Sequence, residues 1–146
     1  MASFLARMYT ALTGGLAPVV VTPFIDIGTA SEFARDDIAR IYGLGVTTGT
    51  TPTTYSPKDL VTREQMASFL ARLFKAVTAT DAPAGPTPFK DVPDESFAKA
   101  DIGRIYGLEI TTGTSPTTYS PKNFVTREQM ASFLARLFRA AGGTIS

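Results

Sequence analysis

The stretch that decides the fold runs from Val61 to Arg72 and reads Val-Thr-Arg-Glu-Gln-Met-Ala-Ser-Phe-Leu-Ala-Arg. It returns letter for letter at residues 125–136, and residues 1–7 repeat its second half, residues 66–72. As a helix, the stretch gathers apolar side chains on one broad face, with polar ones off it. The apolar residues are Met66, Phe69, Leu70, Leu73, Phe74 and Val77, and the residues off that face are Arg63, Glu64, Ser68 and Arg72. Three helices with this apolar face are predicted to pack together at the centre of the fold.

The start of this helix is also marked. Thr62 followed by Gln65 three residues later fits a capping box, in which each side chain bonds the other residue's backbone N–H. Pro57 stops any earlier helix from continuing into it. We therefore expect a helix from about Arg63 and a matching one from Arg127.

Composition excludes several classes of protein. The chain has 146 residues, a net charge of +1, no cysteine and no histidine. Lys and Arg are not clustered, so we expect no nucleic-acid partner. Without Cys or His there are no disulfides, thiolate or imidazole catalysts or usual zinc ligands, and we expect no metal and no cofactor. No segment approaches the ~18 apolar residues of a membrane span, and the N-terminus lacks the pattern of a signal peptide.

Two repeats of about 64 residues organise the chain. Residues 33–76 and 97–140 align without a gap and are identical at 35 of 44 positions. Each repeat has a Phe-x-Asp segment, a first helix expected from near Ser31 or Glu95, a Thr/Gly/Pro-rich loop and the capped helix. We expect a single all-α domain over residues 1–142. Its parts are an orphan helix (1–12), a linker (13–23), the first full repeat (24–77), a second linker (78–88) and the second full repeat (89–141). Because the chain begins in mid-repeat, we expect an upstream portion to have been removed or to be absent.

The order of these motifs resembles the S-layer homology (SLH) repeat in its actinobacterial style. The shared motifs are Phe-x-Asp-Ile/Val, Gly-Val-Thr-Thr-Gly-Thr, Tyr-Ser-Pro, Val-Thr-Arg-Glu-Gln and Phe-Leu-Ala-Arg. The resemblance implies a pseudo-threefold all-α fold around a central three-helix bundle, with the first repeat incomplete here. It also implies that grooves between repeats bind secondary cell-wall polysaccharide, often pyruvylated. The implied location is extracellular, at the cell wall or S-layer.

The resemblance further implies the ligand-binding residues. They come from the family's Thr-Arg-Ala-Glu motif, its opening Asp and the Gly before the Thr-rich loop. The matching residues are Thr62, Arg63, Thr126, Arg127, Asp26, Asp91 and Gly45. Two departures stand out: Phe33 and Phe97 replace the family's frequent Trp, and Glu109 replaces the Gly in the second repeat. A carboxylate there would repel an anionic sugar, which puts that groove in question.

Arg63 and Arg127 also have a physical reason to bind an anion. Free backbone N–H groups at a helix start favour anions, and an Arg fork binds a carboxylate through two bonds. A pyruvyl ketal would supply that carboxylate. The structural alternative is that Arg63 pairs with Glu64 or with Asp37.

Four other candidates admit two interpretations. Asp26 and Asp91 could bind ligand, but a turn or cap role is favoured. Tyr55 and Tyr119 could stack on sugars, although plugging the loop onto the helices is favoured.

No constellation of catalytic groups is present. The adjacent pair Asp36-Asp37 becomes Ala100-Asp101 in the second copy, so a paired-carboxylate mechanism would be lost there. We therefore expect no enzyme. Two functions remain open: a carbohydrate-binding wall anchor, or a structural surface protein that packs against other proteins. In the second, the incomplete first repeat would leave an apolar flank for a homo-oligomer.

Overall fold

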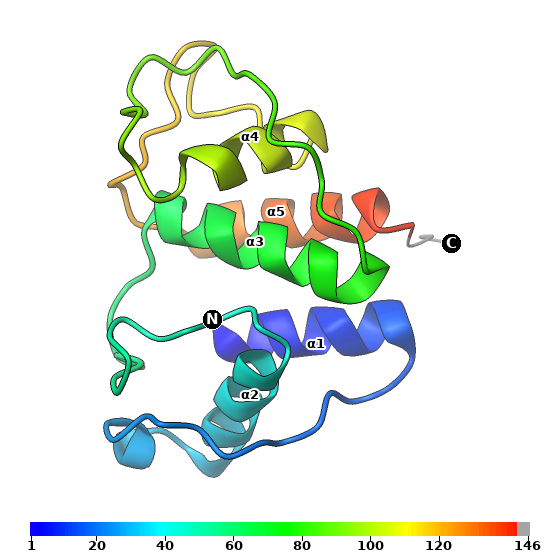
Figure 1. Ribbon diagram of the computed structural model, residues 1–146, viewed down its shortest axis with the longest axis vertical. Helices are drawn as coiled ribbons and strands as arrows, with labels where there is room; N and C mark the ends of the chain where they lie inside the picture. The colour runs from blue at the N-terminus through cyan, green and yellow to red at the C-terminus, as the bar shows by residue number, and fades with distance from the viewer. Residues whose placement is uncertain (143–146) are drawn as a thin grey trace. The chain divides into compact units, whose positions relative to one another are not determined.

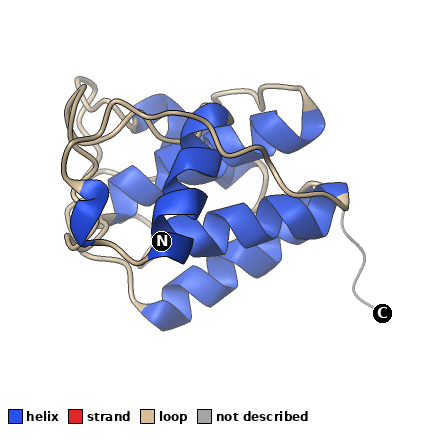
Figure 2. Ribbon diagram, turned by 90° about the horizontal axis from the view of Figure 1, so that it is seen from below, coloured by secondary structure: helices blue, strands red, loops and turns tan. Residues whose placement is uncertain are grey.

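The computed structural model describes residues 1–142, and every regular element in them is helical. The elements are α1 (Ala2–Thr13), the short 3-10 helix η1 (Ile27–Thr29), α2 (Glu32–Gly43), α3 (Arg63–Thr78), α4 (Lys99–Gly107) and α5 (Arg127–Ala140). Within the described residues there is no strand, only isolated bridges, and Figure 2 accordingly shows blue helices and tan loops. The all-α prediction is confirmed. None of these helices has both the length and the apolar character that a bilayer crossing requires.

The chain divides into two compact units, the first ending at Asp59 and the second starting at Leu60. In the first unit, α1 packs against α2 (Figure 1). Its fully buried side chains are Leu5, Ile38, Ile41 and Val46. Each of these sits on the apolar side of its helix or at the turn after α2, so burial of this face holds the unit together.

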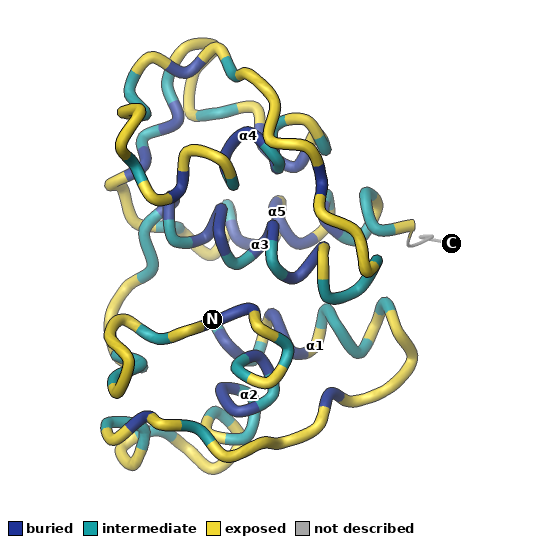
Figure 3. Tube along the Cα trace, viewed as in Figure 1, coloured by how far each residue is buried: buried dark blue, intermediate teal, exposed yellow. Residues whose placement is uncertain are grey.

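In the second unit, α3 packs against both α4 and α5. Figure 1 shows α4 (yellow-green) and α5 (orange) beside α3 (green). The fully buried side chains include Met66, Leu70, Leu73, Ile102, Ile105 and Leu137. Figure 3 shows burial concentrated on the helices of each unit, with the linkers and loops mostly exposed. A three-helix bundle that also includes α1 stays a prediction.

Two expectations about the helices need correction. On α3, Arg63 and Glu64 are buried although they lie off the apolar face, because the loop of the second repeat covers the start of this helix. Ser68 is buried as well. The first helix of the second repeat begins at Lys99, later than the expected start near Glu95. Ser31 caps α2 by accepting a bond from Ala34 N–H, whereas Ala98 precedes α4 without a side-chain cap.

The two units repeat the same long-range contacts. Arg40 Nε donates to the carbonyl of Ala17 (3.1 Å), and Arg104 Nε donates to that of Ala82 (3.0 Å). Each of these arginines also forms a 2.9 Å ion pair with the Asp three residues before it. Each linker is therefore fastened to the helix that follows it. The boundary between the units lies inside the first sequence repeat, since α2 packs against the helix before it and α3 against the helix after it.

Candidate functional site

The start of α3 has the capping box that the sequence predicts. Thr62 Oγ1 accepts from Gln65 N–H (3.3 Å), and Gln65 Oε1 accepts from Thr62 N–H (2.9 Å). The same reciprocal pair joins Thr126 and Gln129 at α5, with both distances 3.1 Å. Both helix starts thus carry the same local cap, made by two residues three positions apart.

Arg63, the first residue of α3, is enclosed by the loop of the second repeat. Its side chain donates from Nε to the carbonyl of Tyr119 at 2.6 Å. The guanidinium carbon lies 4.6 Å from the ring centroid of Tyr119 and 5.3 Å from that of Phe133. Tyr119 Oη in turn donates to the backbone carbonyl of Arg63 at 2.9 Å. Arg63 is only 3% exposed as a result.

The backbone N–H groups at the start of α3 are occupied rather than free. Arg63 N–H donates to the carbonyl of Asn123 (2.8 Å), and Glu64 N–H donates to that of Pro121 (3.0 Å). Gln65 N–H is taken by the cap. The expectation that these groups would receive an anion is therefore wrong at α3, because loop carbonyls already fill them.

The charge of Arg63 has no counter-ion in the described part of the chain. No carboxylate of residues 1–142 lies within 4.0 Å of its guanidinium. The two acids suggested as its partners are engaged elsewhere: Glu64 pairs with Lys122 (2.7 Å), and Asp37 pairs with Arg40 (2.9 Å). Burial lowers the pKa of Arg63, and the attraction of Tyr119 and Asp91 opposes that shift. The lowered value means that desolvation outweighs every local attraction for this cation.

The tip of Arg63 still reaches solvent. Among residues 1–142, its side chain donates a hydrogen bond only from Nε. Its Nη1 and Nη2 atoms are nevertheless absent from the fully buried unpaired polar atoms of this region, where Ser68 Oγ stands alone. Each Nη atom therefore keeps at least a small exposed area, although Arg63 as a whole is buried.

Asp26 and Asp91 each clamp the loop of their own repeat. Asp26 accepts from the N–H groups of Tyr55 (2.9 Å) and Ser56 (2.8 Å), and Asp91 accepts from those of Tyr119 and Ser120, both at 2.8 Å. The favoured structural role is thus present, but over 28 to 30 residues rather than as a local cap. The Tyr55 N–H bond is the largest cause of a lowered pKa at Asp26.

The tyrosines of the two loops differ in burial. Tyr119 is fully buried, which confirms the favoured role of plugging the loop. Tyr55 is half-buried and packs against Phe24, with ring centroids 5.6 Å apart. Burial raises the pKa of both phenols, to about 12 for Tyr55. Both tyrosines therefore stay neutral at ordinary pH.

Gly45 and Glu109 follow the C-termini of α2 and α4 at equivalent positions. Both backbones are left-handed, with φ of 76° and 62°. Glycine adopts this conformation at little cost, while Glu109 must bear strain there. Both residues are exposed, so neither contributes to the core.

Arg127 and Thr126 lie in a different setting from their counterparts. Both are exposed, as is Glu128, although Arg63 and Glu64 are buried. In the described chain no loop follows α5 to cover them. The structure therefore brings Arg63 together with Tyr119 and the Asp91 clamp, and it leaves the Arg127 position open.

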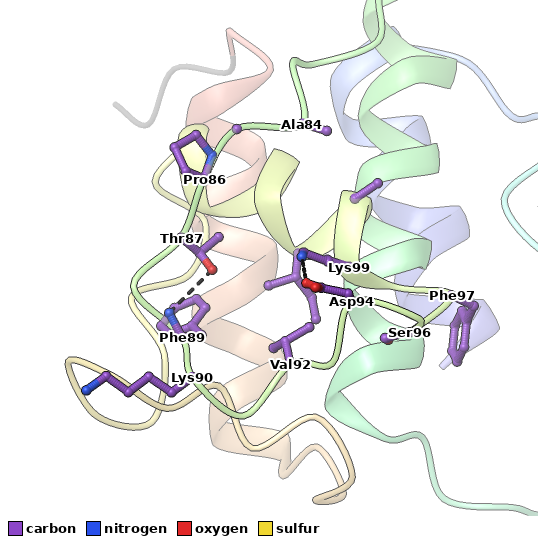
Figure 4. Close-up of a pocket in the computed structure, with 13 residues that line it drawn as sticks. Ala84, Pro86, Thr87, Phe89, Lys90, Val92, Asp94, Ser96, Phe97 and Lys99 are labelled. Atoms are coloured by element: carbon purple, nitrogen blue, oxygen red, sulfur yellow. Dashed lines mark hydrogen bonds and ion pairs between the residues drawn. The ribbon is translucent and has the colours of Figure 1, made fainter.

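A separate cleft of about 710 Å³ lies in the second unit, between the linker at residues 84–87 and the start of α4 (Figure 4). Lys99 and Asp94 form an ion pair within it, and Phe97 stands at its edge. None of the predicted site residues lines it. No motif of the sequence marks this cleft.

Comparison with known proteins identifies the family of these repeats. The S-layer homology domain matches residues 23–67 and 88–131, which is more than half of the chain. A cell surface protein of Thermoanaerobacter kivui is 28% identical over 92% of this chain. An endoglucanase of Bacillus sp. (strain KSM-635) is 28% identical over 90%, and an S-layer protein of Bacillus thuringiensis subsp. finitimus is 28% identical over 75%. The matches span only 17%, 14% and 13% of these three proteins. The two matched segments cover most of the two repeats, and the chain belongs to the S-layer homology family.

Proposed function

We propose that the chain is a non-catalytic cell-wall anchoring module that binds an anionic, pyruvylated secondary cell-wall polysaccharide. Membership of the S-layer homology family and similarity to a cell surface protein and an S-layer protein support a role at the cell surface. The endoglucanase match covers only 14% of that enzyme. An anchoring segment common to otherwise different proteins accounts for these matches.

The observation that carries the proposal is the buried charge of Arg63, which forms an ion pair with no carboxylate of residues 1–142. A buried cation is costly unless it is paired, and the desolvation of Arg63 is only partly offset by one carbonyl and two aromatic rings. An anion that reaches the Nη atoms would complete the pairing. The carboxylate of a pyruvyl ketal has the planar shape that an Arg fork binds through two bonds.

The other candidate residues take supporting roles in this proposal. Thr62 and Thr126 hold the helix starts, while Asp26 and Asp91 hold the loops. Gly45 lets the chain turn into the first Thr-rich loop. Arg127 would form a second, weaker anion site, because its exposed guanidinium lacks the enclosure that strengthens electrostatic attraction at Arg63.

The test is co-sedimentation with purified pyruvylated wall polysaccharide. We expect Arg63→Gln to weaken binding about 10- to 100-fold, the range of a charged hydrogen-bonding group worth roughly 1.5–3 kcal/mol. Arg63→Lys keeps the charge but loses the fork, and should fall between wild type and Arg63→Gln. Arg127→Gln is the matched control, with an identical local sequence and an expected loss of only a few-fold.

Two further controls separate binding from folding. Each variant is compared with wild type by urea unfolding, because Arg63 Nε also fastens the Tyr119 loop. The polysaccharide is also tested after its pyruvyl groups are removed. Wild-type retention by a folded Arg63→Gln variant would refute Arg63 as the site, and equal retention of the depyruvylated polymer would refute the carboxylate.

A structural, self-assembling surface protein is the second candidate function. Its support is the exposed side of α5, which matches a packing surface used elsewhere in the same chain.

A further inference from the structure

Helix α5 carries an unused copy of the surface by which α1 holds α2. The buried residues of α1 are Ala2, Leu5 and Ala6, and α1 packs against α2. The repeated sequence places Ala131, Leu134 and Ala135 at the equivalent positions of α5. Leu134 is buried there, but both alanines are exposed.

The same surface is occupied on α3. Ala67 and Ala71, which are the counterparts of Ala131 and Ala135, are buried, and α3 packs against α4. The chain therefore shows the same helix sequence in two environments. On α3 this surface is covered by α4, the first helix of the second repeat, and on α5 it is uncovered. In both cases where this surface is covered, the helix that covers it is the first helix of a repeat, α2 or α4.

The start of α5 likewise lacks the contacts that its counterpart on α3 makes. At α3, backbone N–H groups of Arg63 and Glu64 dock on loop carbonyls of the second repeat. At α5, the equivalent N–H groups of Arg127 and Glu128 have no acceptor among residues 1–142. The side chains of Arg127 and Glu128 are exposed as well.

The loop of the first repeat supplies the complementary half. Residues 55–60 differ from residues 119–124 only in having Asp59 for Asn123 and Leu60 for Phe124. In the second repeat, the carbonyls of Tyr119, Pro121 and Asn123 receive the start of α3. In the first repeat, the equivalent carbonyls belong to Tyr55, Pro57 and Asp59. None of them accepts a hydrogen bond within the described part of the chain.

We propose that two copies of this 146-residue chain associate by exchanging helices, with α5 of one copy taking the place of α1 against α2 of the other. The start of α5, residues 126–129, then docks on the partner's loop 55–60 as the start of α3 docks on loop 119–124. This association needs no ligand, although its interface includes Arg127, which also belongs to the proposed weaker anion site.

The repeated sequence gives the energetic reason for the exchange. Helices α1 and α5 carry the same residues at the three buried positions, so replacing one by the other conserves that packing. Helix α1 begins at Ala2 without a side-chain cap bond, whereas α5 begins with a complete capping box. Helix α5 therefore adds the docking bonds of its first turn to the packing that α1 already provides. Exchange of an element between protomers is a low-cost route to a dimer, and here α5 takes the place of α1, the helix with the equivalent buried residues.

Engineered disulfides test the contact directly, because the chain has no cysteine of its own. Thr62 and Phe124 face each other in an antiparallel bridge, a spacing that a disulfide can span. The equivalent pair across two copies is Thr126 and Leu60. Thr126→Cys and Leu60→Cys proteins are mixed, oxidised and run on a non-reducing gel. We expect the cross-linked heterodimer as the main product, above either homodimer.

The double variant Thr62→Cys plus Phe124→Cys is the matched control, and it should close within a single chain. If this control closes but the mixed variants give no excess of heterodimer, the exchange is refuted. It is also refuted if Thr126→Cys plus Leu60→Cys in one chain closes internally as a monomer.

Light scattering over a dilution series gives a second, independent measurement. Wild type should shift from monomer toward dimer as concentration rises. Ala135→Arg, which places a charge on the exposed side of α5, should stay monomeric at every concentration while remaining helical by circular dichroism. A strictly monomeric wild type would overturn the proposal, whatever the outcome of the polysaccharide assay.

Discussion

The starts of α3 and α5 have the same twelve-residue sequence and two different environments. At α3, Arg63 and Glu64 are buried beneath the loop of the second repeat. At α5, Arg127 and Glu128 are exposed. The capping boxes are the same in both, so the local fold is equal and the difference arises entirely from the chain that follows. A sequence motif can therefore build a helix start by itself, but it becomes a buried cationic site only when another repeat covers it.

The largest effect should come from removing the residue that covers Arg63. Tyr119 is fully buried and bonds Arg63 through both its carbonyl and its hydroxyl. Tyr119→Ala should lower the free energy of unfolding by about 3–5 kcal/mol, as for other buried aromatics. Tyr55→Ala, at the half-buried equivalent, should cost about 1–2 kcal/mol. Urea unfolding followed by circular dichroism measures both, and equal losses would contradict the asymmetry between the two loops.

A smaller effect should be the same at both helix starts. Thr62→Ala and Thr126→Ala each remove one side-chain bond to the N–H of the third helical residue. Each should cost about 1 kcal/mol, since capping is local and independent of the covering loop. Thr62→Ser and Thr126→Ser keep the hydroxyl and serve as controls. A much larger loss at Thr62 than at Thr126 would show that the cap also supports the docked loop.

The smallest effect should be a change in how stability depends on pH. Hydrogen bonds from Tyr55 N–H and Ser56 N–H lower the pKa of Asp26. A carboxyl whose pKa falls on folding stabilises the protein above its ordinary pKa of 3.8, and loses that contribution as pH drops through the lowered value. Asp26→Asn should therefore be less stable than wild type at neutral pH and similar to it near about pH 2.

Asp36→Asn is the control for the pH experiment, since its carboxylate accepts no hydrogen bond from residues 1–142. Urea midpoints at a series of pH values give the comparison. A gap between wild type and Asp26→Asn that persists unchanged into acid would assign the effect to geometry rather than to charge.

Much of the local structure could be predicted from the sequence. The capping boxes, the α3 and α5 boundaries and the plugging role of Tyr119 all follow from short-range patterns, and the structure agrees. These features depend on residues within a few positions of each other or on the size of a single side chain. The family likeness was equally readable, because it rests on the order of motifs along the chain.

The surroundings of Arg63 could not be predicted in the same way. Its neighbours Tyr119 and Phe133 are 56 and 70 residues away in sequence, and the contact arises from packing between successive repeats. The apolar periodicity of α3 also gave no sign that Glu64 and Ser68 would be buried, since periodicity reports one face of a helix and α3 uses two.

The mismatch between sequence repeats and compact units has a consequence for recombination. A gene duplication that copies residues 24–77 as a block would separate α2 from the helix that it packs against, and would do the same to α3. A crossover near residues 59 and 60 would instead move a helix together with its linker, its packing partner and the loop that follows. Chimeras and tandem extensions of this chain should therefore be joined at that point, just ahead of the Val-Thr-Arg-Glu segment, so that each transferred block carries its own core.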